Sequence, residues 1–415
     1  MISKHNPFIA IFTLVLVFNV LFPQPSAQTQ NMTSHIEIPD GDRKRFDELL
    51  QWVFDTMNRE YYIPPSQAVF DQFIQDYPIE KVYEINARNK KVDDYVYLGA
   101  GLLVFKLRDK NDRFSTFFPP VQAVEFKQEA YAAKKDLGLK GQKNERGYQL
   151  TKVQLHSDAY LKGVRSGDVI LEINQKSILD FSEAEITVLL NPEVATWTKL
   201  KLNLQSSGIT EIDLQSKSYF IETVNFSETI IPGVVVFGIE HFNQKTSQDL
   251  LFYMEDYGID KIEHMVIDLR NNKGGPPLAT REILGFFTKP LDPLFFIIRR
   301  NRRPMLMQSP NSDVLYSGGM TVLVNDMTAS AAETLSGVLR EKNIADMIGQ
   351  KTNGACYLKS MYDYSDGSTM MLVTSQTFFH NERVFPPNGL TPDILLPADS
   401  NALDYTISNL TKTLK

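Results

Sequence analysis

The spacing of apolar residues predicts helices in the first part of the chain. Between residues 43 and 62 the apolar positions recur at helical spacing on one face, at Phe46, Leu49, Leu50, Val53 and Met57. Further helical stretches cover residues 66–77 and 95–110. The region up to about residue 125 is therefore predicted to be small and mostly helical, and to serve as a scaffold or a lid.

The pattern then changes to short strands. Alternating apolar and polar residues predict strands near 148–155, 168–174, 198–204 and 209–214. One helix, at 182–190, lies between them and stops before Pro192. Residues 126–218 are therefore expected to form a compact β-rich module.

From residue 219 to residue 415, strands and helices alternate. Strands are predicted at 234–240, 264–269 and 320–325, with helices following at 246–257, 279–287 and 330–340. The first of these helices is expected to open with a capping box of Thr246 and Asp249 and to close at Gly258. This alternation predicts an α/β layer with a largely parallel sheet, whose sites lie at the carboxyl ends of the strands.

The amino terminus has the pattern of a secretory signal peptide. Lys4 and His5 precede an apolar run from Phe8 to Phe22, and Pro23 and small residues follow it. We expect residues 1–27 to be cleaved and the mature protein to be exported, to the periplasm or the outside of the cell, with no stable membrane span. The alternative is an uncleaved anchor, although the run is shorter than the roughly 20 residues of a spanning helix.

Composition and charge exclude some functions. The 415 residues carry 43 basic and 50 acidic side chains, a net charge of −7, which gives little support to nucleic-acid binding. The single cysteine, Cys356, excludes an intramolecular disulfide and a multi-cysteine metal site, and we expect it to be buried. The histidines lack metal-ligand spacing, so no metal ion or cofactor is predicted. The basic run at 299–303 is expected to be a solvated loop.

Two strand ends carry candidate chemistry. The first, at 268–275, runs into Gly274 and Gly275, where the backbone could approach a ligand closely. The second, at 325–333, places Ser330 between a strand and a helix N-terminus. An exposed hydroxyl beside helix N–H groups is typical of a nucleophilic serine, although the same position suits an ordinary N-cap.

These segments together resemble the C-terminal processing (tail-specific) serine peptidases, over nearly the whole chain. The similar motifs, in the family's order, are NDRFSTFF, IDLRNNKGG, VLVNDMTASAAETLSGVL, IGQKTNG and NGLTPDI. DLGLKG with SDAYLKGVRSGDVILEINQKSI resembles a PDZ domain. The resemblance implies an α/β protease core at 219–415, a PDZ domain at 126–218 and a helical N-terminal region at 28–125.

The resemblance also assigns roles to residues. It implies that Ser330 is the nucleophile and that the backbone N–H groups of Ala331 and Gly274 form the oxyanion hole. In the PDZ domain, Leu137, Gly138 and Leu139 would capture the terminal carboxylate of a polypeptide tail in a nest of N–H groups. Polypeptide substrates or tails are therefore the expected partners, and the oligomeric state is left open.

One position departs from the family. The general-base lysine of these peptidases corresponds to Ala355, and the supporting glutamine corresponds to Lys359. Three interpretations remain: Lys359 acts as a displaced base, with its pKa lowered by desolvation; His241 or His380 acts as the base; or catalysis is lost. Lys351 is not expected to have a catalytic role.

The sequence thus leaves functions of different classes open. The first is an exported serine endopeptidase that binds tails through its PDZ domain and cleaves with Ser330. The alternative is a catalytically impaired relative that binds peptides or serves as a scaffold. A third hypothesis is a carrier of small apolar ligands, because the interphotoreceptor retinoid-binding protein shares this core fold.

Overall fold

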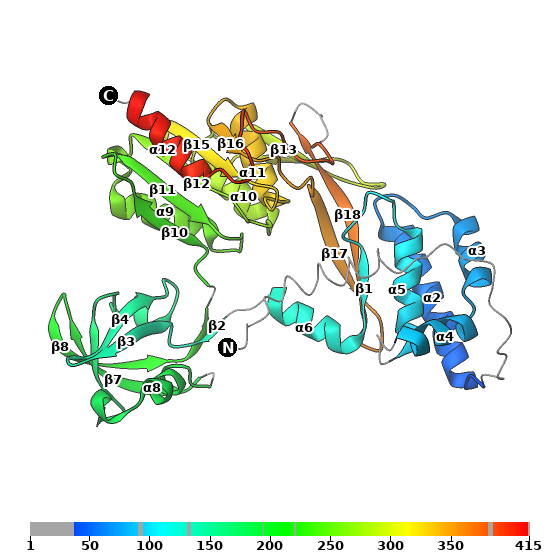
Figure 1. Cartoon of the computed structure of the whole chain (residues 1–415), viewed down its shortest axis with the longest axis horizontal. Coiled ribbons are helices and arrows are strands. Elements are labelled where there is room, and N and C mark those ends of the chain that lie inside the picture. The colour runs from blue at the N-terminus through cyan, green and yellow to red at the C-terminus, as the bar shows by residue number, and fades with distance from the viewer. Residues whose placement is uncertain are drawn as a thin grey trace. The chain divides into compact units, whose positions relative to one another are not determined.

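The chain folds into two compact units. The computed structural model describes residues 37–89, 94–130, 134–193, 195–219, 221–380 and 385–413. One unit extends to Val124 and includes Lys359–Ser375, and the other contains Glu125–Leu358 and Gln376–Lys415 (Figure 1). The predicted signal peptide lies outside the described residues. Within these ranges, no helix is both long enough and apolar enough to cross a bilayer.

The N-terminal unit is built on four helices. These are α2 (Asp40–Glu60), α3 (Gln67–Asp76), α4 (Ile79–Asn89) and α5 (Tyr95–Leu107). The three predicted helical stretches are thus confirmed, and all five apolar positions predicted on α2 are buried. Strand β1 (Thr116–Phe118) pairs antiparallel with the start of β18 (Thr369–Phe379), and helix α6 (Pro120–Ala130) follows β1.

The C-terminal unit begins with an antiparallel sheet module. Its strands are β3 (Leu139–Asn144), β4 (Gly147–Val153), β5 (Val169–Ile173), β7 (Trp197–Leu204) and β8 (Gly208–Gln215), in that spatial order, with β6 (Lys176–Ser177) beside β5. The predicted helix is α8 (Glu183–Leu190), and the short α7 (Asp158–Leu161) and η1 (Ile178–Asp180) complete the module. Strand β2 (Lys134–Asp136) precedes the module in the chain and β9 (Lys217–Tyr219) follows it, and the two pair with each other in a separate antiparallel sheet. Strand β3 is an edge strand of the larger sheet.

A second sheet forms the α/β layer. Its order is β10 (Val224–Glu228), β11 (Val234–Ile239), β12 (His264–Asp268), β15 (Gly319–Val324), β16 (Asp346–Gly349) and β19 (Ile394–Leu395). The five strands from β11 to β19 are parallel, whereas β10 is antiparallel to β11. The predicted largely parallel sheet is therefore confirmed, and β10 is an edge strand that the alternation did not predict.

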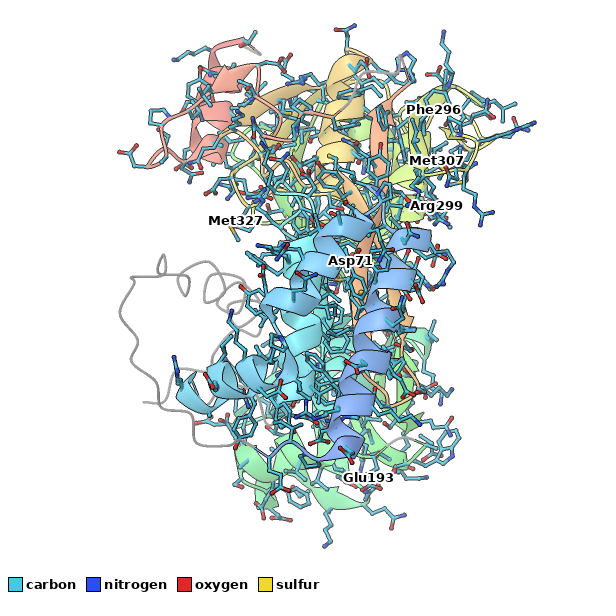
Figure 2. The ribbon with its side chains drawn as sticks, turned by 90° about the vertical axis from the view of Figure 1, so that its right-hand side faces the viewer. Asp71, Glu193, Phe296, Arg299, Met307 and Met327 are labelled. Carbon is cyan, nitrogen blue, oxygen red and sulfur yellow. The ribbon has the colours of Figure 1, made fainter. Side chains whose placement is uncertain are left out.

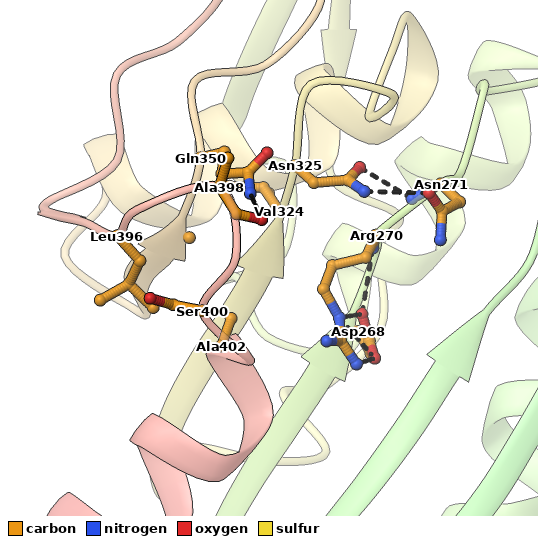
Figure 3. A pocket seen from close by; sticks show the side chains of 11 residues that line it. Asp268, Arg270, Asn271, Val324, Asn325, Gln350, Leu396, Ala398, Ser400 and Ala402 are labelled. Carbon is orange, nitrogen blue, oxygen red and sulfur yellow. Dashed lines mark hydrogen bonds and ion pairs between the residues drawn. The ribbon is translucent and has the colours of Figure 1, made fainter.

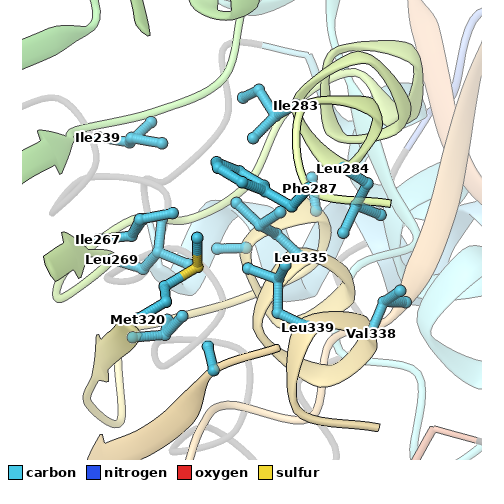
Figure 4. Packing of buried hydrophobic residues seen from close by; sticks show 14 of the residues in the cluster. Ile239, Ile267, Leu269, Ile283, Leu284, Phe287, Met320, Leu335, Val338 and Leu339 are labelled. Atoms are coloured by element: carbon cyan, nitrogen blue, oxygen red, sulfur yellow. The ribbon is translucent and has the colours of Figure 1, made fainter. Parts of the chain in front are cut away.

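Helices cover both faces of this sheet. On one face are α9 (Thr246–Tyr257), α10 (Pro277–Gly285) and α11 (Ala331–Glu341), whose apolar side chains pack against those of β11, β12 and β15. Figure 4 shows Ile267 and Met320 of the sheet among Leu284 and Leu335 of the helices. The opposite face packs against α12 (Ala402–Thr413) (Figure 1). Because both faces are covered, strands such as β11 are apolar throughout.

A hairpin and two long strands complete the fold. The hairpin consists of β13 (Pro293–Arg299) and β14 (Met305–Gln308), with Phe296, Arg299 and Met307 labelled in Figure 2. The basic run at 299–303 forms its turn and is mostly exposed, as predicted. Strand β17 (Tyr357–Asp363) and β18 continue along the chain from one unit into the other. Cys356 is buried in the core, also as predicted.

The predicted capping box at α9 is wrong. Thr246 is the first residue inside the helix rather than its cap, and its hydroxyl accepts from the N–H of Asn243 at 2.8 Å. The Asp249 carboxylate is fully buried and bonds to His156 Nε2 at 2.5 Å and to the N–H of Thr223 at 3.1 Å. Tertiary partners therefore replace the local cap. The predicted helix end is confirmed, because Gly258 has φ +94°.

Candidate active site

Ser330 lies on a strained turn between β15 and α11. Its φ of 57° and ψ of −119° are in a region that residues with a Cβ rarely occupy. Its side chain is half-buried and stands at the N-terminus of α11, where helix N–H groups and the helix dipole favour negative charge. The predicted placement of this serine between a strand and a helix is confirmed.

The glycine turn after β12 touches this serine. Gly274 has φ +93°, and a Cβ added to it would lie 2.7 Å from Ser330 Cβ and 2.8 Å from the nitrogen of Ala331. The N–H of Ala329 also donates to the carbonyl of Asn272 at 2.9 Å, which joins the two turns. The parallel neighbours β12 and β15 bring these turns together, because their carboxyl ends meet at one edge of the sheet.

The candidate oxyanion donors differ in what they bond to. The N–H of Gly274 donates to Asn272 Oδ1 at 2.8 Å. Asn272 is fully buried, and its Nδ2 donates to the carbonyl of Ile239 at 2.7 Å. The N–H of Ala331, by contrast, has no acceptor among the residues that the structure describes. Ala331 is therefore free to donate to a ligand, whereas Gly274 is held by a side chain that the sequence interpretation missed.

Position 355 carries no base. Ala355 is 2% exposed and belongs to the segment after β16. The next residue, Cys356, has its Sγ 4.0 Å from the carbonyl oxygen of Ser330. Burial, reinforced by the nearby Glu333 carboxylate, raises the pKa of the Cys356 thiol, so the thiol stays protonated and is not a nucleophile.

The two histidines proposed as bases lie in different places. His241 follows β11, and the N–H of its neighbour Phe242 donates to the carbonyl of Gly274 at 3.0 Å. Desolvation lowers the pKa of His241, against the opposing effect of acidic neighbours, so its imidazole is neutral at pH 7. His380 Nδ1 is instead 3.6 Å from Glu341, at the end of α11 opposite to Ser330. An 11-residue helix is about 16 Å long, which argues against His380 as the base.

Lys359 belongs to the N-terminal unit. Its ammonium group lies 4.8 Å from the centre of the Phe114 ring. Desolvation lowers the pKa of Lys359, but the side chain is exposed, which weakens that effect, and Asp112 opposes it. Asp112 in turn accepts from the hydroxyl of Tyr61 at 2.8 Å and from the N–H of Ser115 at 2.9 Å. Asp112 thus holds the segment that leads into β1. The hypothesis that Lys359 is a displaced base stays a prediction.

A polar pocket of about 240 Å³ opens at the carboxyl ends of β12, β15 and β16 (Figure 3). Polar residues that line the pocket bond to one another: Arg270 forms an ion pair with Asp268 at 2.6 Å, and Asn325 Nδ2 donates to Asn271 Oδ1 at 2.9 Å. Asn325 Oδ1 also accepts from the N–H of Asn271 at 2.9 Å. These bonds link the turn after β12 to the turn that leads to Ser330.

The predicted carboxylate-binding loop is occupied by the chain's own acceptors. The N–H of Gly138 donates to Asp136 Oδ1 at 2.6 Å, and the N–H of Leu137 donates to the carbonyl of Leu190 at 3.3 Å. Leu139 continues into β3. A terminal carboxylate could therefore use the N–H groups of Leu137 and Gly138 only after these internal bonds open.

Sequence and structure comparisons identify related proteins. Residues 233–396 match the model of Peptidase family S41. Carboxy-terminal processing protease CtpA of Bacillus subtilis (strain 168) is 23% identical over 341 residues, which cover 82% of this chain and 68% of that protein. Carboxyl-terminal-processing peptidase 1, chloroplastic, of Arabidopsis thaliana is 27% identical over 253 residues, 59% of this chain and 51% of that protein, so the match spans about half of the plant protein.

One solved structure shares the fold over most of the chain. It is a photosystem II D1 C-terminal processing protease, with a TM-score of 0.50 and 18% identity, and the match covers 85% of this chain and 94% of that one. At this identity the likeness concerns the fold alone.

Proposed function

Because the chain belongs to peptidase family S41, a family of serine-type hydrolases, we propose that it is a C-terminal processing endopeptidase with Ser330 as its nucleophile. The observation that carries this proposal is the strained backbone of Ser330 at the N-terminus of α11, in contact with Gly274. Such a turn holds the hydroxyl against the peptide N–H groups that stabilise a developing oxyanion.

The oxyanion would be bound by backbone donors. Ala331 supplies a free N–H, and Gly274 supplies the second when its bond to Asn272 Oδ1 opens. Attack of the serine oxygen on a substrate carbonyl would form a tetrahedral oxyanion. Its collapse would break the peptide C–N bond and release the amine, which takes up the proton that the base removed from the serine. The acyl-enzyme that remains would then be hydrolysed by water, which regenerates the serine hydroxyl. The base that takes the serine proton is Lys359 or His241.

The sheet module would present the substrate. We propose that residues 126–218 form a PDZ domain that adds a polypeptide tail to the free edge of β3, between β3 and α8. In this proposal, the N-terminal region consists of residues 28–125 and the protease core of residues 219–415. Export through a signal peptide at residues 1–27 would place the protein in the periplasm or outside the cell.

One observation favours a second function. Ala355 stands where the family's lysine is expected, and removal of a general base slows a peptidase by several orders of magnitude. A catalytically impaired relative would keep the peptide-binding module and the oxyanion donors and would act as a peptide-binding or scaffold protein.

The test is covalent labelling of Ser330. A fluorophosphonate probe is incubated with the chain lacking residues 1–27 and with its Ser330→Ala variant, and labelling is followed by mass spectrometry. Labelling of the parent alone, with cleavage of a polypeptide tail that the variant lacks, supports the peptidase. If the parent is neither labelled nor able to cleave but still binds the tail, the impaired relative is the better description.

A further inference from the structure

The Glu333 carboxylate is fully buried and surrounded by hydrogen-bond donors from two segments. Its Oε2 accepts from the N–H of Ser330 at 2.9 Å and from the N–H of Ala355 at 2.8 Å. Its Oε1 accepts from the N–H of Gly354 at 2.7 Å and from the hydroxyl of Thr352 at 2.6 Å. A carboxylate has about four acceptor sites, so these four donors use its full capacity.

These contacts suit a group that only accepts hydrogen bonds. Three of the donors are backbone N–H groups, and an amide or a protonated acid would turn a donor of its own toward them. Within the described part of the chain no lysine or arginine forms an ion pair with Glu333. The charge is balanced instead by N–H dipoles and by the N-terminus of α11, where Glu333 is the third helical residue.

The carboxylate connects two parts of the proposed active site. One is the strained turn of Ser330, and the other is the segment 352–355, which ends at the position of the family's lysine. Desolvation of a buried charge costs free energy, and an apolar side chain of similar volume would fill the same space without that cost. Packing alone therefore does not account for a carboxylate at this position. We propose that Glu333 is a positioning residue whose carboxylate keeps the nucleophile and residue 355 at a fixed separation; this rests on the proposed role of Ser330.

The test compares matched substitutions at the two ends of α11. Glu333→Gln removes the charge beside Ser330, and Glu341→Gln makes the same change at the far end of the helix. Fluorophosphonate labelling, the kcat and KM of tail cleavage, and amide hydrogen exchange are measured on the full mature chain. We expect Glu333→Gln to slow labelling and kcat by about 100-fold, since a displacement near 1 Å has an effect of that size, with KM unchanged.

Hydrogen exchange gives a readout that does not need activity. Exchange should quicken in residues 328–334 and 350–356 together in Glu333→Gln, and in neither segment in Glu341→Gln. Glu333→Asp keeps the charge but shortens the reach, and should recover part of the rate. If Glu333→Gln does not fold, Thr352→Val removes one donor to the same carboxylate and should slow labelling about 3- to 10-fold.

The outcomes separate the two proposals. The positioning role is overturned if Glu333→Gln is labelled at the parental rate, or if Thr352→Val is, where that variant is needed. It is also overturned if hydrogen exchange quickens in only one of the two segments. A parent chain that is neither labelled nor active overturns the proposed peptidase, while exchange in the two segments still decides whether Glu333 joins them.

Discussion

Replacement of Gly274 by alanine tests the contact between the glycine turn and the nucleophile. At φ +93° an alanine adopts a left-handed conformation, which costs about 1–2 kcal/mol. The lower entropy of the unfolded chain returns about 0.4–1 kcal/mol, so the backbone effect alone lowers the free energy of unfolding by about 1 kcal/mol. The new Cβ also lies 2.7 Å from Ser330 Cβ and 2.8 Å from two backbone atoms of the same turn.

This overlap distinguishes Gly274 from a glycine in open space such as Gly163. Overpacking of a well-packed site typically costs about 1–3 kcal/mol, so Gly274→Ala should lower the free energy of unfolding by about 2–4 kcal/mol in all. Gly163 is the matched control, because its φ is +88° and a Cβ added there meets nothing within 4 Å. Gly163→Ala should therefore show only the backbone effect of about 1 kcal/mol.

Two measurements check this reasoning. Urea unfolding gives the change in stability, and the rate of fluorophosphonate labelling reports on Ser330. We expect labelling to fall by about 100-fold in Gly274→Ala and to stay at the parental rate in Gly163→Ala. If Gly274→Ala folds and is labelled within about threefold of the parental rate, the close packing of Gly274 against Ser330 does not control the reactivity of the serine, and the reasoning is refuted.

Four further predictions concern the base, the peptide module and alkaline stability. Lys359→Ala and Lys359→Arg should both abolish tail cleavage if Lys359 is the base, since a guanidinium does not release its proton, and turnover within a few-fold of the parent would redirect attention to His241. Ala355→Lys should raise cleavage above the Ser330→Ala background, and more so with Lys359→Gln, because two close ammonium groups repel; equal rates for the single and double variants would contradict this. Asp136→Ala should increase the affinity for a tail peptide over its amidated twin in fluorescence titration, because it frees the N–H of Gly138, and an unchanged ratio would argue against carboxylate capture there. Burial raises the pKa of Tyr316 to about 12, so its contribution to stability is complete below pH 10 and is lost as the pH rises from 10 to 12; in urea unfolding Tyr316→Phe should flatten that decline, and an equally steep decline would assign it to other groups.

Much of the fold followed from local patterns. The helical spacing on α2, the alternation in β7 and the apolar run of β11 each report which faces of an element are covered, and periodicity records such burial directly. The placement of Ser330 was also predictable, because a strand, a short turn and a helix follow one another along the chain. The hairpin of β13 and β14 escaped prediction, since its basic turn suggested only a loop.

The helices and strands with a clear apolar period, and the proximity of Ser330 to a helix N-terminus, could be read from the sequence, because each depends on residues close together in the chain. The acceptor that each polar group binds depends instead on the tertiary fold. Ser330 and Glu333 have the spacing of a capping box, yet Glu333 also binds residues 19 to 22 positions away, and Asp249 binds His156 from 93 positions away instead of capping α9. Such bonds leave no periodic trace, since they form between segments that the packing of the sheet brings together.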